Sequence, residues 1–124
     1  MRHFALLVFV CLFTVASTNV TLAQTPRYTF TVFNYTNDAW AWVTIYTNGS
    51  SGIAEHFCVN PGQRWNGMVT NGKQARQRFE VTANAGCRHP VLADLWKNGA
   101  DRAWICGNRK SGYYVIQHGS NCNR

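Results

Sequence analysis

The sequence predicts an all-β fold: a small antiparallel β-sandwich or barrel of about eight short strands, stapled by two disulfides. Short runs of alternating, β-branched or aromatic residues are separated by turn signals, among them four Asn-Gly pairs. No window of a dozen residues keeps the 3.6-residue apolar period of a helix. Four cysteines follow the N-terminal segment, and an even number in a short chain is typical of disulfides.

Residues 1–23 have the features of a secretory signal peptide. Arg2 and His3 precede an apolar run, and small residues lead to a cleavage site expected between Ala23 and Gln24. The apolar run is too short to cross a bilayer, and no later segment comes close, so no transmembrane segment is expected. The sequence therefore predicts one all-β domain over residues 24–124, secreted or periplasmic.

Beyond the signal peptide, the chain is basic. Loss of Arg2 leaves 11 Lys and Arg against 5 acidic residues, a net charge of +6. This charge is compatible with nucleic acid, anionic lipid or acidic polysaccharide and selects none of them. Because the basic residues are scattered along the chain, ordinary solubilising charge explains them equally well.

The alternating runs place the strands in chain order. They are expected at about 27–34, 39–47, 53–59, 63–70, 75–83, 90–97, 102–107 and 112–118, joined mostly by hairpins. The strand at 75–83 alternates most regularly between a polar side and an apolar side. Its polar side holds Arg76, Arg78, Glu80 and Thr82, and is expected to face solvent.

The first two strands are expected to form a hairpin around a loop at 34–38. Its register gives one face consisting of Tyr28, Phe30, Val32, Trp40, Trp42 and Tyr46. Cross-strand aromatic pairs commonly fill the core of a sandwich, so we expect the Trp40 and Trp42 face to be core. A platform for a glycan is the alternative interpretation.

The last three strands are expected to form a meander with one apolar face. That face holds Ala93, Leu95, Ala103, Ile105, Tyr113 and Val115. On the reverse face Asp94 would lie opposite Trp104, Trp96 opposite Arg102, and Trp104 opposite Tyr114. Charged groups are seldom buried unless paired, and flat rings beside fixed donors and acceptors suit a sugar or a protein partner. The candidate ligand-binding residues are Asp94, Trp96, Arg102, Trp104 and Tyr114. The alternative is a covered face in which Asp94 and Arg102 form a structural ion pair.

The four cysteines of the domain are expected to form two disulfides, and we favour Cys58 with Cys87 and Cys106 with Cys122 over the two alternative pairings. Zinc is the rival interpretation, but no two of them stand in a C-x-x-C pair. No metal and no cofactor is expected.

Catalytic motifs do not stand out in the sequence. There is no G-x-S-x-G, H-E-x-x-H or phosphate-binding glycine loop. A ribonuclease could use Arg78, Glu80, His89 and His118 for acid–base chemistry and phosphate binding, but this set is assembled from residue types alone. An enzyme is therefore not the preferred interpretation, and no catalytic residue is assigned.

The sequence favours a secreted binding module. The expected partner is a glycan, a cell-envelope component or a protein, and an inhibitor belongs to this class. One alternative is a small basic secreted hydrolase such as a nuclease, which leaves nucleic acid open as a partner. Another is a membrane-active protein whose basic charge meets anionic headgroups.

Overall fold

The computed structural model describes residues 27–47, 52–70, 76–119 and 121–122, so the expected signal peptide and its cleavage site lie outside the described residues. The described part is all-β and contains no helix, and therefore none that could cross a membrane. Its strands are β1 (Arg27–Asn34), β2 (Trp40–Tyr46), β3 (Ile53–Val59), β4 (Arg64–Thr70), β5 (Gln77–Asn84), β6 (Arg88–Lys97), β7 (Arg102–Asn108) and β8 (Gly112–Ile116). Every boundary lies within two residues of its predicted position.

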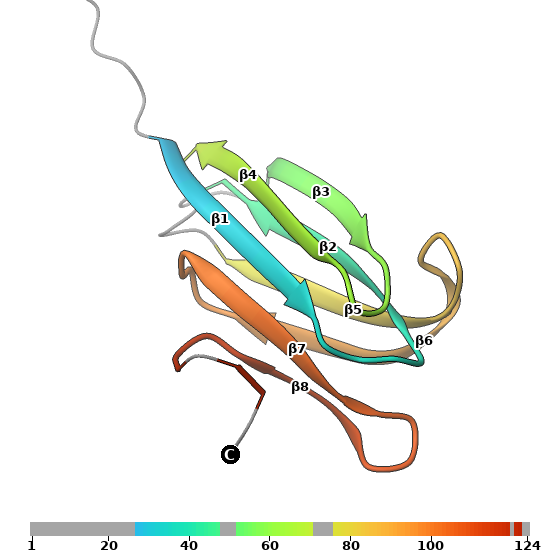
Figure 1. Ribbon diagram of the computed structural model, residues 1–124. Helices are drawn as coiled ribbons and strands as arrows, with labels where there is room; N and C mark the ends of the chain where they lie inside the picture. Colours follow the sequence, from blue (N-terminus) through green and yellow to red (C-terminus); the bar gives the residue numbers. More distant parts are fainter. Residues whose placement is uncertain (1–26, 48–51, 71–75, 120, 123–124) are drawn as a thin grey trace, which may run out of the picture.

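The strands form two four-stranded sheets that enclose one core (Figure 1). One sheet has the order β4-β1-β7-β8, and the other has the order β3-β2-β5-β6. All neighbours are antiparallel except β1 and β7, which are parallel. The predicted fold class is confirmed, and the architecture is a sandwich.

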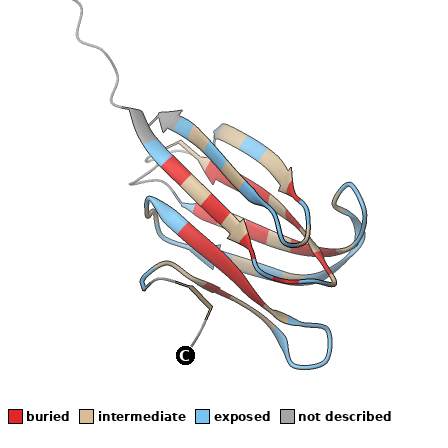
Figure 2. Cartoon of the chain, in the orientation of Figure 1, coloured by how far each residue is buried: buried red, intermediate tan, exposed pale blue. Residues whose placement is uncertain are grey.

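The core consists of alternate residues from both sheets, seen as buried bands along the strands in Figure 2. Its buried members are Phe30, Val32, Ala39, Ala41, Val43, Ile45, Val59, Phe79, Val81, Ala103, Ile105 and Val115. Because successive side chains of a strand point to opposite faces, the residues between these positions form the two outer faces.

The expected hairpin of β1 and β2 is wrong. β1 pairs with β4 and β7, whereas β2 pairs with β3 and β5 in the other sheet. Buried Asn34 fixes the crossing between the sheets: its Nδ2 donates to the carbonyl oxygens of Ala39 at 2.9 Å and Val59 at 3.0 Å. Its Oδ1 accepts from the backbone N–H and the hydroxyl of Thr36. These bonds satisfy the buried polar groups at the point where the chain crosses from one sheet to the other. In a tight hairpin, hydrogen bonds of the sheet itself would satisfy them.

The assignment of the Trp40 and Trp42 face to the core is also wrong. The inner face of β2 consists of Ala41, Val43 and Ile45, which are fully buried. Trp40 and Trp42 are half-buried on the outer side of the same strand. Phe30 of β1 does lie in the core, because it belongs to the opposite sheet and faces inward.

The expected meander at the C-terminus is correct only in part. β6 and β7 lie in different sheets, so the pairing between them is wrong. β7 and β8 do pair, but Ile105 lies opposite Val115 and not opposite Tyr113, a shift of two residues. A shift by an even number keeps every side chain on its face. The predicted apolar residues therefore still point inward, with Ala93 and Leu95 contributed from the other sheet.

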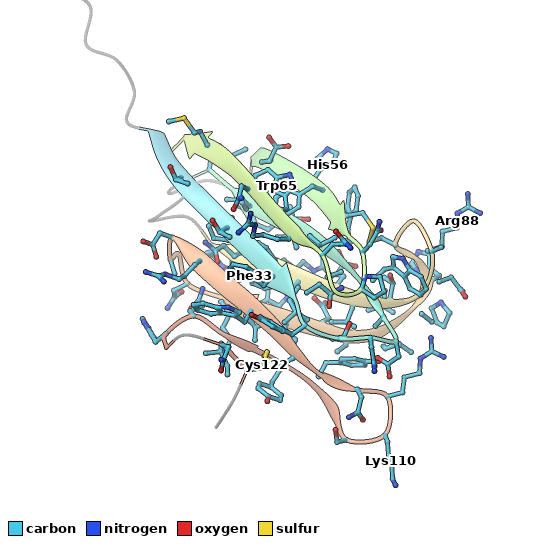
Figure 3. The ribbon with its side chains drawn as sticks, viewed as in Figure 1. Phe33, His56, Trp65, Arg88, Lys110 and Cys122 are labelled. Carbon is cyan, nitrogen blue, oxygen red and sulfur yellow. A yellow bond between two sulfur atoms is a disulfide. The ribbon has the colours of Figure 1, made fainter. Side chains whose placement is uncertain are left out.

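Both predicted disulfides are confirmed. Cys58 of β3 is bonded to Cys87 in the turn between β5 and β6, with the Cα atoms 5.9 Å apart. Cys106 of β7 is bonded to Cys122 in the C-terminal segment, with a Cα separation of 5.7 Å (Figure 3). Each disulfide joins a strand to a turn or segment attached to the same sheet.

Candidate functional site

The five residues predicted to bind a ligand do not form one surface. Asp94 and Trp96 lie on the outer face of β6. Arg102, Trp104 and Tyr114 lie on the outer face of β7 and β8, in the other sheet. The expected pairs between β6 and β7 are wrong, and Trp104 lies opposite Ile116, not opposite Tyr114. The core separates the two groups.

On β7 and β8 the aromatic rings are used for packing. Trp104 is 3% exposed, and its ring stacks on that of Phe33 with centroids 5.8 Å apart and an angle of 7° between the planes. The hydroxyl of Tyr114 donates to the carbonyl oxygen of Cys122 at 3.4 Å, and the disulfide to Cys106 holds that segment in place. A ring as buried as that of Trp104 offers no face to a ligand.

On β6, Asp94 belongs to a cluster of three charges. It lies opposite Glu80 of β5, a pair of like charges that would repel. The guanidinium of Arg78 offsets this: its Nε and Nη2 donate to both oxygens of Asp94, at 2.9 and 2.8 Å, and Nε lies 3.7 Å from Glu80. These bonds to Arg78 lower the pKa of Asp94, and the bonds to Asp94 raise the pKa of Arg78. Asp94 and Arg78 are therefore both charged at neutral pH, and their two hydrogen bonds fix them relative to each other.

Trp96 lies directly beside this cluster and is 42% exposed. Its ring stacks on that of Tyr46, with centroids 5.5 Å apart and planes at 17°. The guanidinium carbons of Arg76 and Arg78 lie 4.6 and 4.9 Å from the ring centroid, within the range of cation–π attraction. Packing against these three side chains holds the exposed indole in a defined orientation.

A second aromatic group lies on the same outer face. The ring of Trp42 lies 5.1 Å from that of His56, which Figure 3 labels on β3. Trp42 also lines a shallow concavity together with Glu80 and His89. We call this surface the tryptophan face; it consists of Trp42, Tyr46, His56, Arg76, Arg78, Glu80, Asp94 and Trp96.

Of these residues, only Asp94 and Trp96 were predicted as ligand-binding. Arg76, Arg78 and Glu80 were expected on the solvent-facing side of their strand. Trp42 and Tyr46 were missed because the expected β1–β2 hairpin placed them in the core. The signal that could have found them is the fully apolar set Ala41, Val43 and Ile45, which competes with the tryptophans for the inner face of β2.

The tryptophan face has the dimensions of an extended site. Trp42 and Trp96 are separated by two strand spacings and two residues along the strand, which puts their Cα atoms about 12 Å apart. That span exceeds a single sugar ring. Fixed guanidinium donors and carboxylate acceptors lie between the two rings, as a ligand with many hydroxyl groups would require.

The residues considered for a nuclease are brought together only in part. Arg78 and Glu80 are neighbours, and Glu80 shares the concavity with His89. His118 follows β8 in the other sheet. Within the described residues, no three His, Cys, Asp or Glu side chains gather in a way that could hold a metal ion. No protein-family model, curated protein or solved structure matches the chain.

Proposed function

We propose that this chain is a glycan-binding module that acts outside the cytoplasm and recognises a polysaccharide through the tryptophan face. The observation that carries the proposal is the exposed ring of Trp96, held by Tyr46 and two arginines beside the Arg78–Asp94 ion pair. The apolar face of a sugar ring stacks on an indole, while its hydroxyls need donors and acceptors at the edge of the ring.

The rigidity of the face supports binding. A side chain that is ordered before the ligand arrives loses little conformational entropy when it binds. Arg78 and Asp94 hold each other by two hydrogen bonds, and the ring of Trp96 is packed against Tyr46, Arg76 and Arg78. The face therefore presents its groups at little entropic cost.

The charges of the face favour a glycan over a protein partner. The centres of protein interfaces are depleted in Asp and Glu. Here Glu80 and Asp94 stand between the aromatic rings, where their oxygens can accept hydrogen bonds from hydroxyl groups. Export is supported by the two disulfides, since disulfides persist in oxidising compartments.

The test is a titration of the purified protein with a panel of neutral polysaccharides and their oligosaccharides, followed by tryptophan fluorescence and calorimetry. Trp96→Ala should weaken binding by about 2 kcal/mol, or about 30-fold in Kd. Met68→Ala is the matched control, because Met68 is 56% exposed on β4 of the other sheet. The proposal fails if no polysaccharide binds, or if a folded Trp96→Ala protein binds like wild type.

Hydrolysis of RNA is a second candidate, favoured by the shared concavity of Glu80 and His89 next to Arg78. A general acid and base beside a guanidinium is the arrangement that phosphodiester cleavage needs. Cleavage of RNA that is lost in both Glu80→Gln and His89→Ala would establish it. Cleavage that survives both substitutions would assign the activity to a contaminant and remove this candidate.

A further inference from the structure

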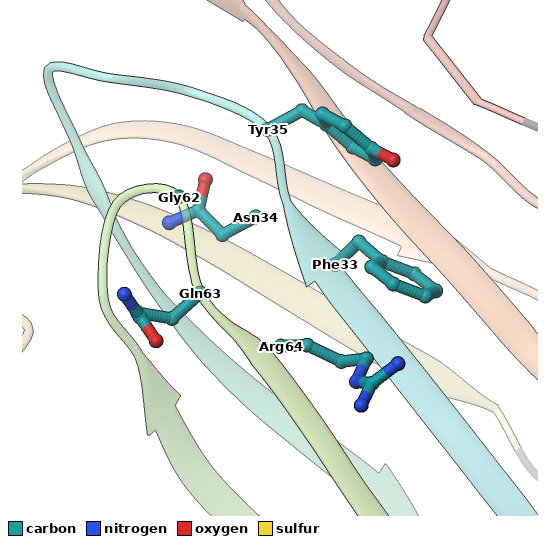
Figure 4. A pocket seen from close by; sticks show the side chains of 6 residues that line it. All are labelled: Phe33, Asn34, Tyr35, Gly62, Gln63 and Arg64. Atoms are coloured by element: carbon teal, nitrogen blue, oxygen red, sulfur yellow. The ribbon is translucent and has the colours of Figure 1, made fainter.

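The outer face of β4, β1 and β7 carries a different set of side chains from the tryptophan face. Phe33 of β1 lies opposite Arg64 of β4 and beside Trp104 of β7. Its ring stacks on that of Tyr35 at 5.9 Å, and the guanidinium of Arg64 lies 5.8 Å from its centroid. Figure 4 shows the three side chains of Phe33, Tyr35 and Arg64 on the same side of β1 and β4, with Phe33 between the other two.

Two adjoining concavities meet at Phe33 and Arg64. The first lies between Tyr35 and Arg64, under the loop at Gly62 and Gln63 (Figure 4). The second extends from Arg64 of β4 across β1 to Arg102 of β7. It is also lined by Thr29, Thr31, Asn66 and Asp101. We call this surface the arginine face; it consists of Thr31, Phe33, Tyr35, Arg64, Asn66 and Arg102.

The arginine face differs from the tryptophan face in its charge balance. Arg64 makes no ion pair with any residue that the structure describes. Arg102 lies 3.8 Å from Asp101, and both side chains are more than half exposed, so solvent screens that pair strongly. Two guanidiniums thus line one concavity with a single carboxylate, whereas the charge of Arg78 on the tryptophan face is offset by two carboxylates, Asp94 and Glu80.

We propose that the arginine face is a second binding site, specific for an acidic glycan, a polysaccharide whose sugars carry carboxylate or sulfate groups. Arg64 and Arg102 bind the anionic groups, Tyr35, which is 52% exposed, stacks on a sugar ring, and Thr31 and Asn66 hydrogen-bond to hydroxyls. The net charge of +6 expected for residues 24–124 attracts such a polymer over long range.

An acidic glycan fits the face better than single-stranded nucleic acid. Proteins that bind a single strand follow its backbone with a basic groove and stack several bases. Only two arginines line the second concavity here, Asp101 lines it beside Arg102, and Tyr35 is the one ring of this face that is more than half exposed. Separated anionic groups on hydroxyl-rich rings match that arrangement.

The test measures Kd by calorimetry for polygalacturonate and dextran sulfate, with unmodified dextran, polyglutamate and single-stranded DNA as comparison polymers. At least one acidic polysaccharide should bind, and the one that binds identifies carboxylate or sulfate as the recognised group. Arg64→Gln and Tyr35→Ala should each weaken it about tenfold or more, as loss of a charged contact or an anchoring ring does. Lys110→Gln removes the same charge from the turn between β7 and β8, labelled in Figure 3, and should change Kd less than about twofold.

Three outcomes would overturn this proposal. The first is that no acidic polysaccharide binds, and the second is that Lys110→Gln raises Kd as much as Arg64→Gln does. The third is that DNA or polyglutamate binds as tightly as the acidic polysaccharide and loses the same affinity in Tyr35→Ala. Circular dichroism of each variant confirms that it is folded. The result is separable from the proposed function, because the tryptophan face is tested with neutral polysaccharides and with Trp96.

Discussion

Replacing Trp96 and Trp104 by alanine should have unequal effects on the free energy of unfolding. Trp96 is 42% exposed and Trp104 is 3% exposed. The difference of 39 percentage points, applied to the about 250 Å² that a large aromatic side chain can bury, corresponds to about 100 Å². At about 25 cal/mol/Å² this is about 2.5 kcal/mol. Trp104→Ala should therefore cost about 3 to 5 kcal/mol, as buried aromatic deletions do, and Trp96→Ala about 1 to 2 kcal/mol.

The measurement is urea unfolding of both variants, followed by far-ultraviolet circular dichroism so that loss of an indole does not change the signal. Phe33→Leu provides a further check on Trp104, because it removes the stacked partner while leaving an apolar side chain. Equal losses in the two tryptophan variants, or a larger loss for Trp96→Ala, would refute the assignment of Trp104 to packing and of Trp96 to the surface.

Three other predictions concern stability. Gly107→Ala should cost about 2 kcal/mol or more in urea unfolding, because Gly107 has φ of +102° and a Cβ there would collide with the carbonyl oxygen of Gly112; a neutral effect would contradict this. Asp94→Asn should cost less than about 1 kcal/mol at pH 7, and this cost should shrink as the solution is acidified below about pH 4. The reason is that Arg78 lowers the pKa of Asp94, so its contribution is present above its ordinary pKa of about 4 and is lost as the pH falls through the folded value; a cost that does not shrink on acidification would exclude this cause. Cys122→Ser removes a bond that spans 16 residues and should lower the unfolding free energy by about 3 kcal/mol, and an unchanged midpoint would show that the C-terminal segment is held by other contacts.

Strand positions could be predicted because their signals are local. The alternation of Gln77, Phe79 and Val81 with polar residues places the inner side of β5 correctly. Gln77 is a polar residue on this buried side, and its amide is hydrogen-bonded there: it donates to the carbonyl oxygen of Ala100 and accepts from Gln117. The up-and-down course of the strands predicts Cys58, Cys87 and Cys106 near one end of the sheet, and the observed partners Cys58 and Cys87 both belong to the sheet β3-β2-β5-β6 and its turn.

Strand partners could not be predicted because they depend on contacts distant in sequence. Nothing in the loop at 34–38 distinguishes a hairpin from a crossing, since the decisive bonds join Asn34 to Ala39 and to Val59, a residue 25 positions away. The candidate site followed that error. Asp94 and Trp96 were assigned to an exposed face, as observed, but their neighbours come from β2 and β5 and not from β7.

Because the core separates the two outer faces, a single polymer cannot easily contact both faces of the same domain. The tryptophan face and the arginine face point away from each other on opposite sheets. A polymer lying flat on one of them has no short path to the other, so the two proposed sites would gain no effective concentration from each other on a single chain. If both proposals hold, simultaneous occupation would join two separate polymers, and the domain would act as a cross-linker whose valency of two is fixed by the sandwich itself.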